Sequence, residues 1–252
     1  MKALIDGDVY LYQAVHRGLN AVTFDGEHYT YGFHLSELLD DFRASVEGIC
    51  LSLKTLLQTD ISPVICLSSG MNFRKERIDT QYKANRSERK PLALGVLREA
   101  VIDHWFPEIE PGMEADDVMG ILHTKTPKKN TIVCSIDKDM FTLPGYYYNT
   151  DHQELHDISR KEAEEYFLRQ VLAGDRVDNY FGCPGVGEKT AHKLFDEHGY
   201  SWATVLEAYK KAGLSYRDAL RNARCAFILQ ADSYNTTTKH ITLWTPKCLK
   251  LK

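Results

Sequence analysis

Three short apolar runs, separated by helical patterns, most limit the folds open to this chain of 252 residues. The runs occupy residues 2–5, 63–67 and 131–135. Between them, residues 35–57 carry apolar side chains at helical spacing, and residues 114–123 begin a second helical pattern. Strands that alternate with helices are typical of an α/β core with a mostly parallel sheet. We therefore predict this core for the first two-thirds of the chain and a helical annex for the last third.

Composition and charge exclude several classes of protein. No apolar run is long enough to cross a membrane, and we expect no secretory leader before the first strand. The six cysteines are scattered without a Cys-x-x-Cys pair, which argues against a zinc site and a disulfide framework. A reducing, cytoplasmic location is therefore expected. The net charge of −4 does not by itself indicate a nucleic-acid partner, so the distribution of charge matters more than its sum.

Acidic residues recur where predicted strands end and where helices begin. In open α/β sheets, binding sites gather outside the carboxyl ends of the strands. The groups are Asp6 and Asp8; Glu114, Asp116 and Asp117; Asp137 and Asp139; and Asp175 and Asp178, which share one side of a helical turn. Taken alone, each group is also typical of an acidic helix cap or a turn.

Together, the four acidic groups predict a site for divalent metal ions. Carboxylates gathered in one cleft repel each other and cannot all stay ionised without cations. Two cations roughly 3.5–4 Å apart would satisfy them, and this arrangement serves in-line attack of water on a phosphate. An all-oxygen ligand set favours Mg²⁺ over zinc, with Mn²⁺ as a substitute.

A basic stretch supplies a surface for a polyanion. Residues 71–98 contain eight Lys or Arg residues against three acids, with Phe73 and Tyr82 interleaved. Positive charge binds phosphodiesters, and aromatic rings stack on unpaired bases. Lys83 and Arg86, three apart on a predicted helix, could reach one phosphate and stabilise charge in a transition state. The alternative is a solvated basic helix.

A glycine-containing segment opens a predicted helix after Pro184. In residues 185–190 the glycines let backbone N–H groups approach a phosphate at the helix N-terminus. The spacing is not that of a Walker A loop. We interpret the segment as a helix-hairpin-helix clamp on a duplex backbone, assisted by Lys189 and Lys193. The alternative is a plain turn between helices.

Seven short motifs follow one another along residues 5–195. They are Ile5-Asp6-Gly7-Asp8, Asn72-Phe73-Arg74-Lys75-Glu76, Tyr82-Lys83-Ala84-Asn85-Arg86, Glu114-Ala115-Asp116-Asp117, Ser135-Ile136-Asp137-Lys138-Asp139, Gly174-Asp175-Arg176-Val177-Asp178-Asn179 and Gly185-Val186-Gly187-Glu188-Lys189-Thr190-Ala191. In this order they resemble the flap endonuclease / 5′→3′ exonuclease superfamily, and most closely the compact replication exonucleases of tailed phages.

The resemblance implies an α/β fold with a PIN-like nuclease core. The nuclease domain would span residues 1–173, with a helical arch or clamp at about 71–104. A helix-hairpin-helix module of the H3TH type, with further C-terminal helices, would span residues 174–252 and could hold a monovalent cation such as K⁺.

The resemblance also implies roles for individual residues. The first Mg²⁺ would bind Asp6, Glu114, Asp116 and Asp117, with help from Asp8, and the second would bind Asp137, Asp139, Asp175 and Asp178. The residues expected to act in catalysis are Lys83, Arg86, Asp6, Asp117 and Asp137. The residues expected to contact DNA are Phe73, Arg74, Lys75, Tyr82, Lys83, Arg86, Gly185, Gly187, Lys189 and Lys193.

One position departs from the family pattern. Family members usually place a metal-liganding aspartate just after the second strand, where this chain has Ser68-Ser69-Gly70. A serine hydroxyl is a neutral and weaker ligand. The first metal is therefore expected to bind more loosely, through water, or with help from Asp8.

The function implied is a metal-dependent 5′→3′ exonuclease or flap endonuclease acting on DNA with a 5′ end, as a duplex, a flap or an RNA–DNA hybrid. Phage-type replication or recombination in the host cytoplasm would be its setting, with replication proteins as plausible partners. One alternative is a DNA-binding protein of the same fold whose catalysis is weakened at Ser69. Another is an RNA-directed nuclease.

Overall fold

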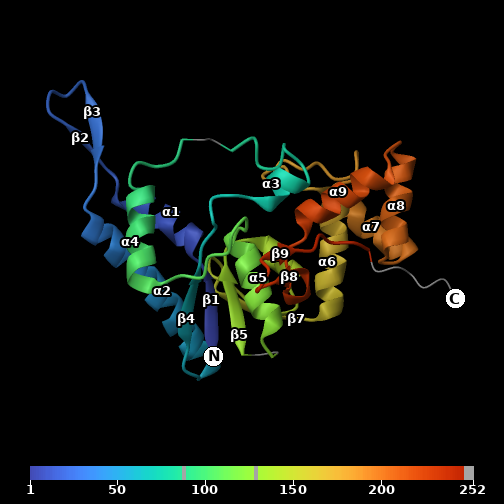
Figure 1. Ribbon diagram of the computed structural model, residues 1–252, viewed down its shortest axis with the longest axis horizontal. Coiled ribbons are helices and arrows are strands. Elements are labelled where there is room, and N and C mark those ends of the chain that lie inside the picture. The colour runs from blue at the N-terminus through green and yellow to red at the C-terminus, as the bar shows by residue number, and fades with distance from the viewer. Residues whose placement is uncertain (87–88, 128–129, 247–252) are drawn as a thin grey trace.

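A five-stranded sheet forms the centre of the computed structural model, which describes residues 1–86, 89–127 and 130–246 (Figure 1). The strand order is β4-β1-β5-β6-β7. These strands are β1 (Lys2–Asp6), β4 (Ser62–Cys66), β5 (Thr131–Ser135), β6 (Gly145–Asn149) and β7 (Glu154–Ile158). The strands β4, β1, β5 and β6 run parallel to one another and β7 is antiparallel to β6, so the predicted α/β class and mostly parallel sheet are confirmed.

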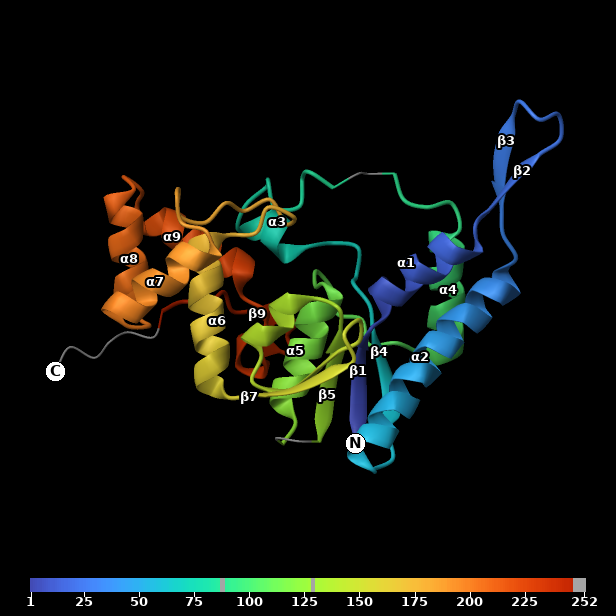
Figure 2. The ribbon, with the colours of Figure 1, turned by 180° about the vertical axis from the view of Figure 1, so that it is seen from behind.

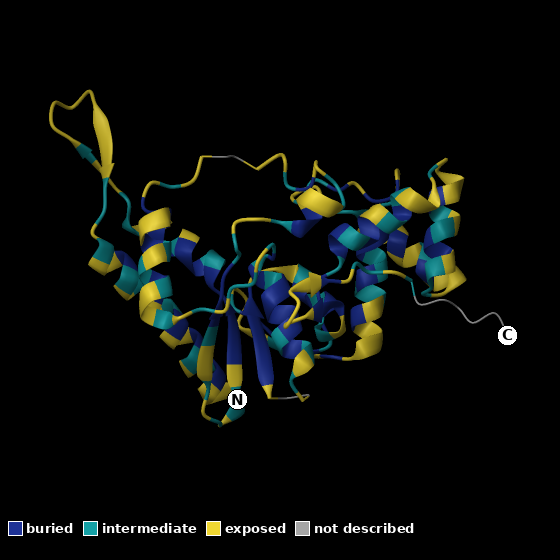
Figure 3. Ribbon diagram, in the orientation of Figure 1, coloured by how far each residue is buried: buried dark blue, intermediate teal, exposed yellow. Residues whose placement is uncertain are grey.

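Helices cover both faces of the sheet, which explains why the central strands β1 and β5 are buried on both faces. One face packs against α1 (Gly7–Gly18), α2 (Leu35–Leu57) and α4 (Leu94–Trp105), and the other packs against α5 (Ala115–Lys125). Along β1, Ala3 and Ile5 face the first core and Leu4 faces the second, as the two-residue period of a strand requires. Figure 3 shows the buried strands between the helices.

The register aligns the carboxyl ends of three strands at one edge. Ile5 lies opposite Ile65 of β4 and Cys134 of β5. Residues that follow these strands therefore emerge side by side. This edge carries the predicted acidic residues, while the other edge carries the short loops that lead into the strands.

Two elements near the N-terminus flank this core. Sequence analysis did not anticipate α1, which follows β1 without a loop and buries Tyr10, Leu11, Ala14 and Val15. The second element is an antiparallel hairpin of β2 (Asn20–Thr23) and β3 (Tyr29–Gly32). Figures 1 and 2 show it projecting from the body, and Figure 3 shows it exposed.

The predicted helical arch is wrong in its helical part. Only α3 (Phe73–Arg77) and α4 are helical in the described part of residues 71–104. Residues 79–86 form turns, and Lys83 has a left-handed backbone with φ 54°. The described residues between α3 and α4, 78–86 and 89–93, cross above the sheet without forming a helix in both ribbon views (Figures 1 and 2). We call these residues the strap.

The last third is helical, as predicted. α6 (Arg160–Ala173), α7 (Glu188–His198), α8 (Trp202–Lys211) and α9 (Tyr216–Ala226) share a third core. The chain then turns back through η2 (Ala231–Ser233), β8 (Tyr234–Asn235) and β9 (His240–Ile241). Ile228, Leu229 and Ile241 join the core around α5, so the C-terminal segment returns to the sheet domain.

Among the described residues, no helix combines the length and the apolar character that a membrane crossing requires.

Candidate active site

Glu114, Asp116 and Asp117 form the centre of the acidic edge. One oxygen from each carboxylate lies within 4.8 Å of the others, a spacing that could hold a metal ion. Glu114 is also the N-cap of α5, and its backbone N–H donates to Asp117 Oδ2 at 3.3 Å. The acidic turn is therefore a helix cap and a carboxylate cluster at once.

A buried arginine holds Asp117. Arg74 donates to both carboxylate oxygens, from Nη1 to Oδ2 at 2.7 Å and from Nη2 to Oδ1 at 2.8 Å. Arg74 is 1% exposed and Asp117 is fully buried. Nη1 also donates to Glu114 Oε2 at 3.2 Å, and two backbone carbonyls accept from the guanidinium, Cys225 O at 3.0 Å from Nε and Phe227 O at 2.7 Å from Nη2. A buried charge needs such partners to offset its desolvation.

Three of the side chains predicted to contact DNA are internal in this structure. Phe73 is 3% exposed and packs in the core around α5, and Arg74 is committed to Asp117. Tyr82 is 2% exposed, so its ring offers no surface for stacking on a base. Lys75, by contrast, lies exposed on α3.

Lys83 links the acidic turn of α5 to the acids that follow α6. Its Nζ donates to Glu114 Oε1 and lies 3.3 Å from Asp178 Oδ2. Tyr82 Oη bridges the same two carboxylates, at 3.1 Å from Glu114 and 2.8 Å from Asp178. Arg86 Nη2 donates to Asp178 Oδ1 at 2.6 Å. Lys83 and Arg86 therefore meet at one carboxylate, from turns rather than from the predicted helix.

A second acidic group lies beyond β5. Asp137 follows the strand and accepts from the N–H of Asp139 at 2.8 Å, at the start of η1 (Lys138–Thr142). Asp175 accepts from the N–H groups of Val177 and Asp178 in a turn closed by backbone bonds to Tyr180. One oxygen of Asp139, Oδ1, is buried without a hydrogen-bond partner. A buried carboxylate oxygen left unpaired is costly, and a cation would satisfy it.

Burial and neighbouring charges shift the pKa values of the acids. Burial and the neighbouring Asp8 and Asp137 raise the pKa of Asp6, which also accepts from Ser135 Oγ at 3.0 Å, to about 7. Burial and the charge of Asp137 raise the pKa of Asp139 to about 7. Burial would also raise the pKa of Glu114, but Lys83 and Arg74 lower it to about 2. These groups fit divalent cations, which favour the ionised form of every carboxylate present.

A family model described as the 5′-3′ exonuclease, N-terminal resolvase-like domain matches residues 2–168. The chain belongs to the 5′–3′ exonuclease family. The exodeoxyribonuclease of Enterobacteria phage T3 is 25% identical over 97% of this chain and 92% of that protein. The exonuclease of Escherichia phage T7 is 26% identical over 73% of each chain. The thermostable DNA polymerase I of Thermus aquaticus is 34% identical over 69% of this chain but only 23% of the polymerase.

Solved structures agree on the fold. The bacteriophage T5 D15 flap endonuclease, solved with DNA and metal ions, superimposes with a TM-score of 0.58 at 15% identity, covering 89% of this chain and 90% of that one. This 5′–3′ exonuclease is therefore a nuclease of the compact phage type, and the predicted resemblance is confirmed. The PIN-like core is likewise confirmed by the fold it shares with the T5 enzyme.

The predicted duplex-binding residues lie together at the start of α7. Gly187 is the N-cap, Gly185 has φ +77°, and a side chain at either glycine would meet open space. Lys189 and Lys193 are exposed on the same helix, and Lys193 is 3.9 Å from Glu197. This helix N-terminus is open to solvent, as a backbone clamp would need.

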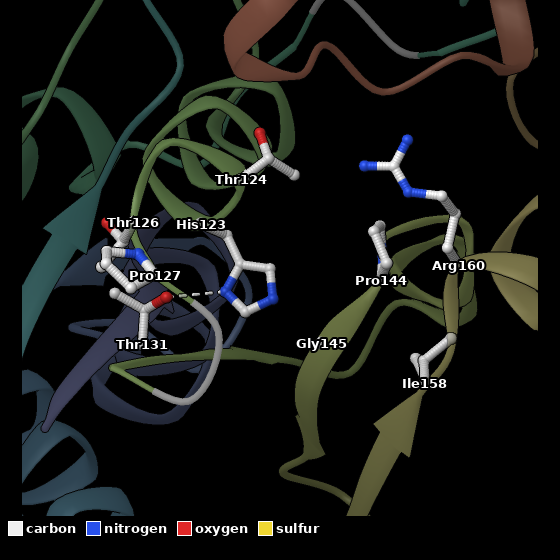
Figure 4. Close-up of a pocket in the computed structure, with 9 residues that line it drawn as sticks. All are labelled: His123, Thr124, Thr126, Pro127, Thr131, Pro144, Gly145, Ile158 and Arg160. Atoms are coloured by element: carbon white, nitrogen blue, oxygen red, sulfur yellow. Dashed lines mark hydrogen bonds between the residues drawn. The ribbon is translucent and has the colours of Figure 1, made fainter.

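A cavity of about 260 Å³ lies at the opposite end of β5 from the acids, and Figure 4 shows its lining. Sequence analysis did not single out His123, whose ring lies there. Its Nδ1 is 2.8 Å from Thr131 Oγ1, and a side chain at Gly145 would press against the ring. Burial lowers the pKa of His123 to about 4. The cavity therefore contains a structural histidine and no group of the nuclease chemistry.

His123 should make the fold sensitive to acid. Its pKa is lower in the folded state than the 6.5 of an ordinary histidine, so the native protein binds fewer protons than the unfolded chain between pH 6.5 and pH 4. This stability is complete above the unfolded pKa and is lost as the pH falls toward 4. We expect a loss of about 2 kcal/mol between pH 7 and pH 5. The free energy of unfolding, measured by urea titration at each pH, should fall more steeply between pH 7 and pH 5 for wild type than for His123→Gln. An equal pH dependence in the two proteins would contradict this expectation.

Proposed function

We propose that this chain is a divalent-metal-dependent 5′→3′ exonuclease and flap endonuclease that hydrolyses DNA by a two-metal mechanism. The observation that carries the proposal is the bridge that Lys83 makes between Glu114 and Asp178, because it brings the two acidic groups into one site. The names of the T3 and T7 relatives, an exodeoxyribonuclease and an exonuclease, support a nuclease acting on DNA.

The acids divide between two Mg²⁺ ions in this proposal. Asp6, Glu114 and Asp116 face the first, and Asp137, Asp139, Asp175 and Asp178 face the second. Bound Mg²⁺ supplies Lewis acidity to the phosphate and lowers the pKa of a water molecule. Mn²⁺ can take the same oxygen ligands.

The protein's own cations act beside these ions. Lys83 and Arg86 lie at the border of the two groups, where a scissile phosphate would carry its developing negative charge. Asp117 acts through Arg74, because its carboxylate is already saturated by the guanidinium and the N–H of Leu229 at 3.0 Å. The catalytic role predicted for Asp117 thereby becomes a positioning role.

The DNA path runs from the strap to the C-terminal helices. Residues 174–252 would form the duplex-gripping module, with Gly185, Gly187, Lys189 and Lys193 at its contact surface and a monovalent cation such as K⁺ at the glycine turn. Lys75 and the strap would bind the 5′ single strand. The substrates are DNA duplexes and flaps with a 5′ end, RNA–DNA hybrids included, and the setting is phage replication in the host cytoplasm.

The test is cleavage of matched duplexes labelled at the 5′ or the 3′ end. With Mg²⁺, the 5′ label should leave first as a mononucleotide or short oligonucleotide, and a 5′ flap should be removed. EDTA should abolish both reactions. Metal-independent binding without turnover would instead favour the weakened DNA-binding protein, and cleavage confined to RNA would favour the RNA-directed nuclease.

Lys83→Met should lower kcat about 100-fold, because the lysine stabilises charge that develops during phosphate cleavage. KM should change little, since the strap and α7 still hold the DNA. Lys54→Met is the control, because Lys54 is an exposed lysine of α2 that lies outside the acidic site and the strap. Single-turnover cleavage gives the comparison, and a Lys83→Met rate within threefold of wild type would contradict this role.

A further inference from the structure

Asp8, Ser68 and Arg98 form a closed set of contacts at the rim of the acid site. Asp8 lies in the first turn of α1, Ser68 follows β4, and Arg98 lies within α4. The backbone N–H of Ser68 donates to Asp8 Oδ2 at 2.9 Å. Arg98 Nη1 donates to Asp8 Oδ1 at 3.3 Å, and Nη2 donates to the Ser68 carbonyl. Each of the three residues therefore holds the other two.

Ser68 connects this set to the acidic turn. Its hydroxyl accepts from the backbone N–H of Ala115, at 3.1 Å, between Glu114 and Asp116. Asp8 in turn lies close enough to Asp6 that its charge adds to the effect of burial on the pKa of Asp6. The contacts thus border the first acidic group, at the place where the family usually has an aspartate and this chain has serines.

Asp8 has no oxygen left without a partner in this arrangement. One oxygen contacts the guanidinium and the other accepts a backbone N–H. The side chains of Asp8 and Arg98 are each 27% exposed, so water only partly screens the pair. A cation bound directly by Asp8 would lie beside the Arg98 guanidinium and be repelled by it, which makes this arginine a competitor of the metal for the carboxylate.

We propose that Arg98 is a positioning residue that keeps Asp8 out of the direct ligand set of the first metal. The inference rests on the proposed function, because it takes the first ion to bind beside the acidic turn. Arg98 neutralises Asp8 much as Arg74 neutralises Asp117. In this proposal Asp6, Glu114 and Asp116 are the direct ligands, and Glu114 keeps this role beside its contacts with Lys83 and Arg74 because it stands within the acidic cluster.

Calorimetric titration with Mg²⁺ alone, without DNA, tests the proposal. Every protein in the series carries Asp175→Asn, so that the second acidic group is weakened and the first dominates the signal. Arg98→Ala should bind Mg²⁺ about 5-fold to 10-fold more tightly, because the released Asp8 carboxylate adds a charged ligand. Arg98→Gln should tighten binding similarly, since it keeps much of the side-chain length but not the charge.

A double-mutant cycle identifies the group responsible. Adding Asp8→Asn to Arg98→Ala should remove the whole gain, whereas Asp8→Asn alone should weaken Mg²⁺ binding by less than threefold. The control is Arg17→Ala, which breaks an exposed pair with Asp41, 2.8 Å apart, and should leave the affinity as it is.

Unchanged or weaker Mg²⁺ binding by folded Arg98→Ala and Arg98→Gln would overturn the proposal while leaving the proposed function intact. The same holds if Asp8→Asn alone weakens binding as much as Asp6→Asn does, since Asp8 would then be a direct ligand. If the parent protein binds no Mg²⁺ even with Asp175 restored, the proposed function and this inference both fall. Circular dichroism of each variant establishes that it is folded.

Discussion

Asp137→Ala should lower the Mg²⁺-dependent cleavage rate by about 1000-fold. Asp137 stands at the carboxyl end of β5 and carries one of the charges proposed to hold the second metal. Loss of that charge weakens binding of the ion, and with it the stabilisation of the transition state that depends on the ion. The measurement is single-turnover release of a 5′ label at saturating enzyme, with Mg²⁺ varied to see whether excess metal restores the rate.

The same variant should not lose stability. Burial is the largest cause of the raised pKa of Asp139, and the charge of Asp137 is the second. Removing the Asp137 carboxylate therefore relieves a repulsion in the metal-free protein. The melting temperature in EDTA should therefore stay equal or rise. Asp151→Ala, an exposed acid in the turn between β6 and β7, is the control and should cleave within twofold of wild type. Full activity in Asp137→Ala would refute the metal assignment.

Arg74→Met should lower the free energy of unfolding by about 3–5 kcal/mol, because it leaves the buried Asp117 carboxylate without its counter-charge. Asp117 is fully buried and cannot be solvated in compensation. The double variant Arg74→Met, Asp117→Asn should recover part of the loss, since the unpaired charge is gone. Urea unfolding at neutral pH measures the free energy of unfolding of wild type, the single variant and the double variant.

The control for Arg74 lies next to it on α3. Lys75→Met changes an exposed side chain of the same charge and should alter stability by less than about 0.5 kcal/mol. If Arg74→Met unfolds within 1 kcal/mol of wild type, the bidentate pair is not the support that its geometry indicates. Asp117→Asn should also impair cleavage, because it disturbs Arg74 and the turn that carries Glu114 and Asp116.

The strands and the acids that follow them were predictable because a buried strand leaves a direct trace in the sequence. The runs 2–5 and 131–135 are apolar on both faces, and parallel register then brings Asp6 and Asp137 to one edge. The second strand was placed on the same grounds. Local pattern was sufficient here because burial on both faces and strand direction together determine where the chain emerges.

The interior position of Arg74 could not be predicted in this way. In sequence it is one of several cations in a basic stretch, and its burial depends on carbonyls about 150 residues further along the chain. The Cys225 carbonyl, for instance, lies 151 residues away. The charge composition of a segment predicts that most of its side chains are exposed. It does not identify the one side chain that the folded protein buries.

The turn at Tyr82–Arg86 differs from the predicted helix for a similar reason. Asn85 donates to the Arg176 carbonyl at 3.0 Å, and Asn179 donates to the Gln81 carbonyl at 2.6 Å. The N–H of Lys83 donates to the Asp178 carbonyl at 2.9 Å. These bonds to the turn after α6 replace the bonds of a helix, and they set the left-handed backbone of Lys83. The local sequence does not predict this conformation, because the groups that stabilise it belong to the turn after α6.

The contacts of Arg74 also impose an order on the making of the enzyme. Its guanidinium is enclosed by the carbonyls of Cys225 and Phe227, and Asp117 accepts from the N–H of Leu229. A ribosome that has released the chain as far as Asp178 has therefore released every proposed metal ligand but not the groups that hold the acidic turn in place. The nuclease centre therefore forms last, after the C-terminal segment has left the exit tunnel and docked against α5.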